Sequence, residues 1–193
     1  MEESSNGHRF ARCCTGFYAL VSYIPEPLGS FLNNLRAEMV SGCHLRSHVT
    51  LLPPRRLAAP APELLADLDA RLPSILPFEL TLADVTCFET TNVIYLNLGP
   101  GRQEVVRIHK ALSTGVMEYA EPFPFHPHIT LAQELTRDEV PELMELARRR
   151  WAEFRGERKF LVDQLAFVQN VCSSEWQTLR DYNLQPAILP QTA

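Results

Sequence analysis

The chain has 193 residues, of which 46% are hydrophobic, and its formal net charge is −5. This length suits one domain of ordinary size or two fused halves, and the hydrophobic content is enough to bury a real core. Proteins that coat long nucleic acids are usually basic, because their affinity comes from neutralising phosphates. The acidic balance therefore argues against an extended nucleic-acid surface, but it leaves room for one phosphate or an RNA end in a small cleft.

Residues 1–15 are expected to be loosely ordered. Their polar sequence lacks the apolar middle of a signal peptide, and no apolar stretch of the chain approaches membrane-spanning length. The five cysteines form neither a CxxC pair nor an even framework, as is typical of thiols in a reducing compartment. We therefore expect a cytoplasmic protein that does not enter a membrane, and we expect it to be a monomer.

Hydrophobic spacing and the positions of proline and glycine predict five elements in the first half of the chain. Aromatic and apolar residues predict a strand that Pro25 ends, and helical spacing then predicts a helix that ends near Gly42. A second strand begins at His48 and is expected to stop at Pro53-Pro54. In order, the elements are a strand at 16–24, a helix at 28–39, a strand at 48–52, a helix around 64–72 and a long strand at 78–88.

The same order of elements then begins again. The first strand of this half is closed by Gly99-Pro100-Gly101, and Thr136 with Glu139 has the spacing of a capping box, which predicts the start of the last helix. In order, the elements are a strand at 93–98, a helix around 105–116, a strand from 128, a helix around 140–151, a long strand at 159–169, a further strand at about 176–184 and a tail at 185–193.

The chain is thus an internal repeat of strand, helix, strand, helix and long strand. In both long strands the alternation of apolar residues slips by one position, which predicts a β-bulge near Asp84 and another near Asp163. The short link between strands 78–88 and 93–98 predicts a hairpin that joins one repeat to the next. We therefore expect an α+β fold in a single bilobal domain at 16–184. Two interleaved antiparallel sheets, with helices on the outside, would be related by a pseudo-twofold axis and separated by a central cleft.

One short pattern occurs at the same step of each repeat. Residues 48–51 read His-Val-Thr-Leu and residues 128–131 read His-Ile-Thr-Leu, 80 positions later (128 − 48). Alternate side chains of a strand share a face, so the histidine and threonine of each copy point one way and the apolar residues the other. One copy would carry little weight, because strand histidines are more often surface or core residues and threonine is a good strand former. The repetition favours a site where the two polar faces meet across the cleft.

Two histidines and two threonines around one cleft suit a displacement reaction at a phosphodiester. Imidazole has an unperturbed pKa of about 6.5, so His48 and His128 can divide the roles of general base and general acid at neutral pH. The hydroxyls of Thr50 and Thr130 can donate hydrogen bonds to the non-bridging phosphate oxygens. This chemistry needs neither a metal nor a cofactor.

A metal site is the alternative interpretation of these histidines. His126 lies two residues before His128, and His44 lies four residues before His48. Neither strand has an Asp or Glu at ligand spacing, and zinc sites in proteins usually include Cys or carboxylate ligands. We therefore favour acid–base chemistry over metal binding.

The paired pattern resembles the two-histidine phosphoesterase superfamily, whose members include RNA 2′,3′-cyclic phosphodiesterases and the so-called 2′-5′ RNA ligases. The resemblance covers residues 16–184, because the order and spacing of the repeat fit as well as the motifs. It implies a bilobal α+β fold whose central cleft opens cyclic phosphates on nucleotides or RNA ends without a metal. It also implies that His48 and His128 are catalytic and that Thr50 and Thr130 bind the phosphate.

The chain departs from that family at one place, where some members carry a basic residue soon after the second motif. Gln133 stands there, so a cationic phosphate contact is missing from this position. Arg55 and Arg56, which follow the first motif, are candidates to supply the positive charge instead. The alternative is that both are exposed loop arginines.

Four aromatic residues are candidates for further substrate contacts. Tyr18 and Tyr95 occupy corresponding strands of the two repeats, where they could stack on a nucleobase or be half-buried sheet residues. Phe123 and Phe125 lie in the Pro-rich segment before the second motif, where they would form a ligand-facing wall or anchor the loop.

These features support two functions of different kinds. The first is a metal-independent phosphodiesterase, a hydrolase rather than a ligase, whose partner is a small nucleotide or an RNA terminus with a 2′,3′-cyclic or 2′-5′-linked phosphate. The second is a module that binds such a ligand without turnover. A third interpretation is phosphoryl or acyl chemistry on a non-nucleotide metabolite, because the motif recognises a phosphate and not the group that carries it.

Overall fold

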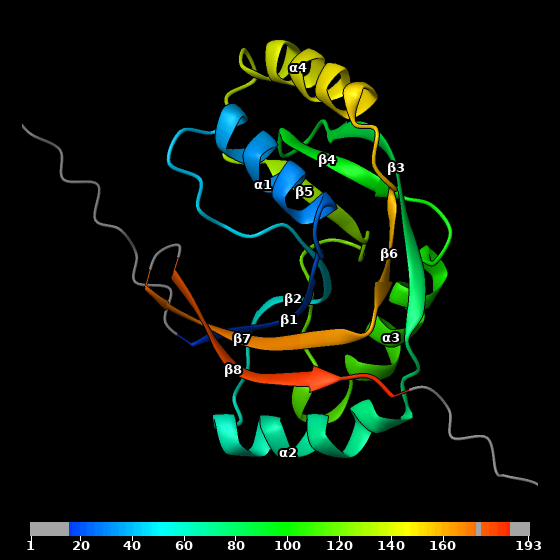
Figure 1. Ribbon diagram of the computed structural model, residues 1–193. Coiled ribbons are helices and arrows are strands. Elements are labelled where there is room, and N and C mark those ends of the chain that lie inside the picture. Colours follow the sequence, from blue (N-terminus) through cyan, green and yellow to red (C-terminus); the bar gives the residue numbers. More distant parts are fainter. Residues whose placement is uncertain (1–15, 173–174, 186–193) are drawn as a thin grey trace, which may run out of the picture.

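The computed structural model describes residues 16–172 and 175–185. The expected loose order of residues 1–15, and all but the first residue of the expected tail at 185–193, lie outside these ranges. The described residues form two four-stranded antiparallel sheets with α-helices around them (Figure 1). None of the described helices is long and apolar enough to cross a membrane.

The elements follow the repeat that the sequence predicts. The strands are β1 (Phe17–Tyr23), β2 (His48–Arg56), β3 (Phe78–Phe88), β4 (Val93–Leu98), β5 (His128–Ala132), β6 (Lys159–Val162), β7 (Gln164–Cys172) and β8 (Glu175–Asn183). The helices are α1 (Leu28–Met39), α2 (Ala61–Arg71), α3 (Arg102–Leu112) and α4 (Val140–Glu153), with short 3-10 turns η1 (Leu72–Ser74) and η2 (Gly115–Met117).

The two sheets have the same construction, with strand orders β2-β1-β7-β8 and β5-β4-β3-β6. In each sheet a histidine-bearing strand is at one edge, and the third strand comes from the other half of the chain. β3 therefore belongs to the sheet of β4 and β5, and β7 to the sheet of β1 and β2 (Figure 1). This exchange confirms the two interleaved lobes. The helices also pack across the repeats, because α1 contacts β5 and α3 contacts β2.

Two expected strand boundaries are wrong. β2 does not stop at Pro53-Pro54 but continues to Arg56, because β2 is an edge strand, where proline is tolerated. The expected strand 159–169 is broken at Asp163 into β6 and β7, which belong to different sheets. The slip in the apolar pattern there marks the passage of the chain from one sheet to the other and not a bulge.

The bulge expected near Asp84 is confirmed. The register of the β3–β4 ladder shifts between Leu82 and Val85, so the buried side chains change parity at this point. The bulged strand pairs with β6 before the shift and mainly with β4 after it. The expected hairpin β3–β4 is an antiparallel pair, and β7 and β8 form a corresponding antiparallel pair in the other sheet.

Local sequence shapes the turns that lead into α3 and α4. Gly101 has φ +91°, and a Cβ there would lie 2.3 Å from the carbonyl oxygen of Glu79, so only glycine fits the turn into α3. Before α4, the backbone N–H of Thr136 donates to the carboxylate of Glu139 at 2.7 Å. α4 itself begins at Val140, with Glu139 as its N-cap and no side-chain cap bond, so this contact closes the turn before the helix and the predicted capping box does not start it.

Candidate functional site

The two histidine strands alternate in burial as the sequence predicts. Val49, Leu51, Ile129 and Leu131 are fully buried in the core. The histidine and threonine of each motif are only half-buried. Each motif therefore has an apolar face that fixes the strand and a polar face that is left for a ligand.

The edge strands β2 and β5 contact each other, one from each sheet. A cleft with a volume of about 640 Å³ opens beside them, and its walls include His48, Thr50 and Thr130. His128 lies two residues before Thr130 on the same face of β5. A positive charge on His128 would lower the pKa of His48. The fold thus places the two motifs on contacting strands, with His48, Thr50 and Thr130 on the cleft wall, whereas His128 is not among the residues that line the cleft.

The two histidines are held by the same hydrogen bond. Nδ1 of His48 lies 2.7 Å from the carbonyl oxygen of Arg46, and Nδ1 of His128 lies 2.7 Å from the carbonyl oxygen of His126. A carbonyl oxygen can only accept, so Nδ1 carries the proton in both rings. Nε2 is then unprotonated in a neutral ring and carries the second proton in a charged ring. Each ring can therefore take or give a proton at Nε2.

Burial disfavours the charged form of both histidines. It lowers the pKa of His48, and the positive charges of Arg36 and His128 lower it further, while the bond to the Arg46 carbonyl opposes them. Burial also lowers the pKa of His128, against its bond to the His126 carbonyl. Of these two rings, only His48 feels a permanent cation, Arg36. The surroundings of the two histidines are therefore unequal.

These lowered pKa values predict that the protein loses stability in mild acid. Below about pH 6.5 the unfolded histidines bind protons that the folded ones resist, so the free energy of unfolding falls as the pH falls. Removing one such group, in His48→Asn, should reduce this slope by up to about 1.4 kcal/mol per pH unit. Urea unfolding between pH 7.5 and 5.5 measures both slopes. An unfolding free energy that stays constant over this range in the wild type would contradict the prediction.

Aromatic rings contact both histidines. The ring of Tyr95 meets His128 edge-on at 5.1 Å between centroids, and it stacks on Phe88 at 4.0 Å. Tyr23 meets His48 edge-on at 6.2 Å. Tyr95 is 5% exposed, so it supports His128 from behind and does not offer a free face to a base. This corrects the stacking alternative for Tyr95 and agrees with the other alternative, a residue of the sheet.

Tyr18 is also placed away from the cleft. Its ring stacks on Phe167 at 5.5 Å within the main core, and its hydroxyl accepts a hydrogen bond from Gln169 at 3.2 Å. The parity of β1 explains this, because Val21 and Tyr23 are paired with Thr50 and His48 and so share the cleft face. Tyr18 lies on the opposite face.

Arg55 does not supply charge to the cleft, which corrects that expectation. It is 1% exposed and forms an ion pair with Glu121 at 2.5 Å. It also donates to the carbonyl of Met117 at 3.0 Å and to the hydroxyl of Ser113 at 3.1 Å. Arg55 therefore fastens the end of β2 to the segment that leads into β5. Arg56 is exposed at the end of the strand, with its guanidinium over the ring of Phe17.

The two phenylalanines before the second motif have different surroundings. Phe125 stacks on His109 at 3.6 Å between centroids, which makes it a loop anchor and not a ligand-facing wall. Phe123 is 62% exposed, and it is not among the residues that line the cleft.

Sequence reasoning missed two features of the cleft. Arg36 of α1 reaches its wall and is 4% exposed. Small apolar and aromatic side chains form a second surface that is separate from the main core and that we call the apolar floor. It consists of Ala19, Val21, Tyr23, Val168 and Trp176. A sequence signal existed for Arg36, because it stands four residues after Leu32, within the buried stripe of a predicted helix.

The described histidines are not part of a set of metal ligands. Among the described residues there is no group of three or more His, Cys, Asp or Glu side chains arranged to hold a metal ion. His44 is exposed on the cleft wall. His126 packs edge-on against Phe88, and its buried Nε2 has no hydrogen-bond partner in the described structure.

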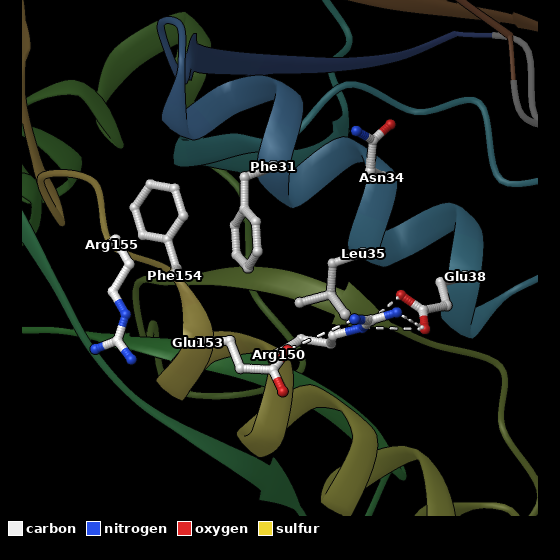
Figure 2. Close-up of a pocket in the computed structure, with 8 residues that line it drawn as sticks. All are labelled: Phe31, Asn34, Leu35, Glu38, Arg150, Glu153, Phe154 and Arg155. Atoms are coloured by element: carbon white, nitrogen blue, oxygen red, sulfur yellow. Dashed lines mark hydrogen bonds and ion pairs between the residues drawn. The ribbon is translucent and has the colours of Figure 1, made fainter.

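A second cavity, of about 410 Å³, lies between α1 and α4, away from the two motifs (Figure 2). Figure 2 shows Arg150 of α4 extended toward Glu38 of α1, where its Nη2 lies 2.8 Å from the carboxylate. Phe31 and Phe154 also line this cavity, with ring centroids 4.4 Å apart. These contacts fasten the two helices together, and none of the predicted site residues lines this cavity.

Sequence comparisons link the chain to known proteins. The model of the 2′-5′ RNA ligase superfamily matches residues 26–171. Two curated relatives are each named a putative phosphoesterase. The one from Oceanobacillus iheyensis is 36% identical over 69 residues, and the one from Bacillus licheniformis is 25% identical over 109 residues. The alignments cover 35% and 56% of this chain, and 40% and 62% of the relatives, so less than two thirds of either relative is matched.

Solved structures share the fold over almost all of the described chain. Escherichia coli LigT in its apo form has a TM-score of 0.61 at 16% identity, over 88% of this chain and 98% of LigT. TT0787 of Thermus thermophilus has a TM-score of 0.60 at 18% identity, over the same shares. LigT has also been solved in complex with 3′-AMP, at a TM-score of 0.59, 17% identity and the same coverage. At these identities the likeness shows the fold.

Proposed function

The chain belongs to the 2′-5′ RNA ligase superfamily of two-histidine phosphoesterases, and we propose on this basis that it hydrolyses a phosphodiester in a nucleotide or at an RNA end. The bond that we expect it to break is in a 2′,3′-cyclic phosphate, and the reaction uses no metal. One observation carries the proposal. His48 and His128 are both half-buried, and each has its Nδ1 proton held by a backbone carbonyl, so Nε2 is left for the substrate.

The proposed reaction is an in-line displacement at phosphorus. One histidine takes a proton from water through Nε2 while the water oxygen forms a bond to phosphorus. The bond from phosphorus to the 2′ or 3′ oxygen breaks on the opposite side, and the other histidine gives this oxygen its Nε2 proton. Thr50 and Thr130 donate hydrogen bonds to the non-bridging oxygens, where negative charge develops. After product release the two histidines exchange protons with solvent and regain their starting states.

The apolar floor supports a nucleotide as the group that carries the phosphate. Ala19, Val21 and Val168 pack with the rings of Tyr23 and Trp176 on the wall of the cleft, and Tyr23 is paired with His48. Every nucleobase has an apolar face, and stacking contributes about 1–3 kcal/mol per base. Nucleotides are also ligands of the neighbour LigT, which was solved with 3′-AMP and with NADP+. A ribose 2,3-cyclic phosphate without a base should therefore be a poorer substrate than a nucleoside 2′,3′-cyclic phosphate.

Replacing either threonine by valine is expected to lower kcat/KM on the order of 10- to 100-fold, because each loses one hydrogen bond to a charged group. Valine keeps the shape of threonine and its preference for strands, so the fold should persist. The assay is hydrolysis of a nucleoside 2′,3′-cyclic phosphate by Thr50→Val and Thr130→Val. Thr81→Val, on β3 outside the cleft lining, is the matched control and should retain wild-type activity.

A substrate panel separates the proposed enzyme from a binding module. Nucleoside 2′,3′-cyclic phosphates, short RNAs with cyclic ends and 2′-5′-linked dinucleotides are incubated with the protein in EDTA. We expect a linear phosphate product from at least the cyclic nucleotides. Saturable binding with intact ligand recovered after long incubation would instead select the binding module. Joining of RNA ends without hydrolysis would select a ligase.

A further inference from the structure

Of the arginines that the structure describes, two are almost completely buried, and only one of these two has a counter-ion. Arg55 and Arg36 are 1% and 4% exposed. Arg55 is paired with the carboxylate of Glu121. Among residues 16–172 and 175–185, no carboxylate forms an ion pair with Arg36. Within the described residues, the charge of Arg55 is therefore neutralised by Glu121, whereas the charge of Arg36 has no opposite charge beside it.

The polar contacts of Arg36 are all with neutral groups. One Nη donates to the backbone carbonyl of Thr130, and the other lies 3.6 Å from the sulfur of Cys43. Its Nε has no hydrogen-bond partner in the described part of the chain. Burying a cation without an opposite charge costs several kcal/mol, so such a group is usually paired or bound to a ligand.

The position of Arg36 indicates which ligand compensates the charge. The guanidinium lies on the wall of the cleft, it is bonded to the second motif, and its charge acts on His48 of the first. Arg46 is the other cleft-lining cation, and its guanidinium lies over the ring of Tyr23 at 4.1 Å on the exposed rim. Gln133, after the second motif, is neutral. Arg36 is therefore a buried positive charge on the wall of the cleft, bonded to the second motif.

We propose that Arg36 binds the phosphate group of the substrate, so that the anion is the missing counter-ion of this buried guanidinium. The inference rests on the proposed function only for the identity of the phosphate-bearing ligand. It gives the cleft a cation that comes from α1 and not from the segment after the second motif. An arginine can donate two parallel hydrogen bonds to a phosphate, which a lysine cannot.

The test is titration of the purified chain with inorganic phosphate at constant pH and ionic strength. Arg36→Met should weaken phosphate binding on the order of 10- to 100-fold, because it removes charged hydrogen bonds and leaves the apolar stem. Arg36→Lys should be intermediate. Arg56→Met, which removes an exposed arginine outside the cleft lining, is the matched control and should bind as the wild type does. Equal phosphate affinity in the wild type and Arg36→Met would overturn the proposal.

A second measurement uses the wild-type protein, so that the proposal is still tested if Arg36→Met does not fold. In wild-type protein with ¹⁵N-labelled arginine, the side-chain Nε resonance that Arg36→Lys lacks belongs to Arg36. Phosphate should shift this resonance, and an unshifted resonance at saturating phosphate, or no phosphate binding at all, would overturn the proposal. Neither experiment needs turnover. Phosphate binding through Arg36 without hydrolysis of any cyclic phosphate would contradict the proposed function while leaving Arg36 as the anion site.

Discussion

Replacing His48 or His128 by alanine is expected to lower kcat on a nucleoside 2′,3′-cyclic phosphate by about 10²- to 10⁴-fold, which is the usual contribution of a general acid or base. The symmetry of the two hydrogen bonds at Nδ1 is the reason that we expect both losses to be large. The losses should not multiply in the double variant, because each histidine works only while the other holds the complementary proton.

Asparagine variants sharpen this experiment. In His48→Asn and His128→Asn the side-chain amide can still donate to the carbonyl two residues earlier, but it cannot exchange a proton near neutral pH. They should therefore be as slow as the alanine variants while perturbing the strands less. Lys110→Ala, on the exposed surface of α3, is the control for expression and folding. Turnover close to wild type in either asparagine variant would remove that histidine from the mechanism.

Glu121→Gln is expected to lower the free energy of unfolding by about 3 kcal/mol, since breaking a buried ion pair leaves one charge unpaired in the interior. The remaining charge is the guanidinium of Arg55, which is 1% exposed, whereas Glu121 itself is 17% exposed. Burial lowers the pKa of Arg55, and Glu121 opposes this shift. The carboxylate therefore compensates a charge that the interior disfavours. Urea unfolding at neutral pH measures the loss.

The chain offers a matched control for this ion pair. Lys159 and Glu79 are bridged at 2.8 Å on neighbouring strands, with side chains that are 46% and 57% exposed. Glu79→Gln should change the unfolding free energy by less than about 1 kcal/mol, as exposed pairs do. If Glu121→Gln were no more destabilising than Glu79→Gln, the bond between the end of β2 and the segment before β5 would not be a structural anchor.

The secondary structure could be predicted where local patterns decide it. Strands 78–88 and 93–98 and the helix at 28–39 have the expected bounds, because alternation of apolar side chains, helical spacing and flanking prolines are local signals. The site could be predicted because the motif occurs twice in an internal repeat. The relation between the repeats then follows from the exchange of β3 and β7 between the sheets.

The predictions that were wrong or missing concern residues whose surroundings depend on parts of the chain far away in sequence. Arg55 follows the first motif and could pass for a loop arginine, but its partners at 113, 117 and 121 are about 60 positions away in the chain. The break at Asp163 depends on which sheet receives each side of the strand. Arg36 is bonded to Thr130, 94 positions later. Only the folded chain reveals that one of these buried arginines is neutralised and the other faces the cleft.

The central claim is that two histidines, without a metal, perform the acid–base chemistry of this cleft. It is tested most directly by kcat/KM for a nucleoside 2′,3′-cyclic phosphate as a function of pH in the presence of EDTA. The account predicts a bell-shaped profile, because one histidine must be neutral and the other protonated. Burial lowers both pKa values, so the maximum should lie below about pH 6.5. A flat profile, or activity that EDTA abolishes and a divalent cation restores, would contradict the account.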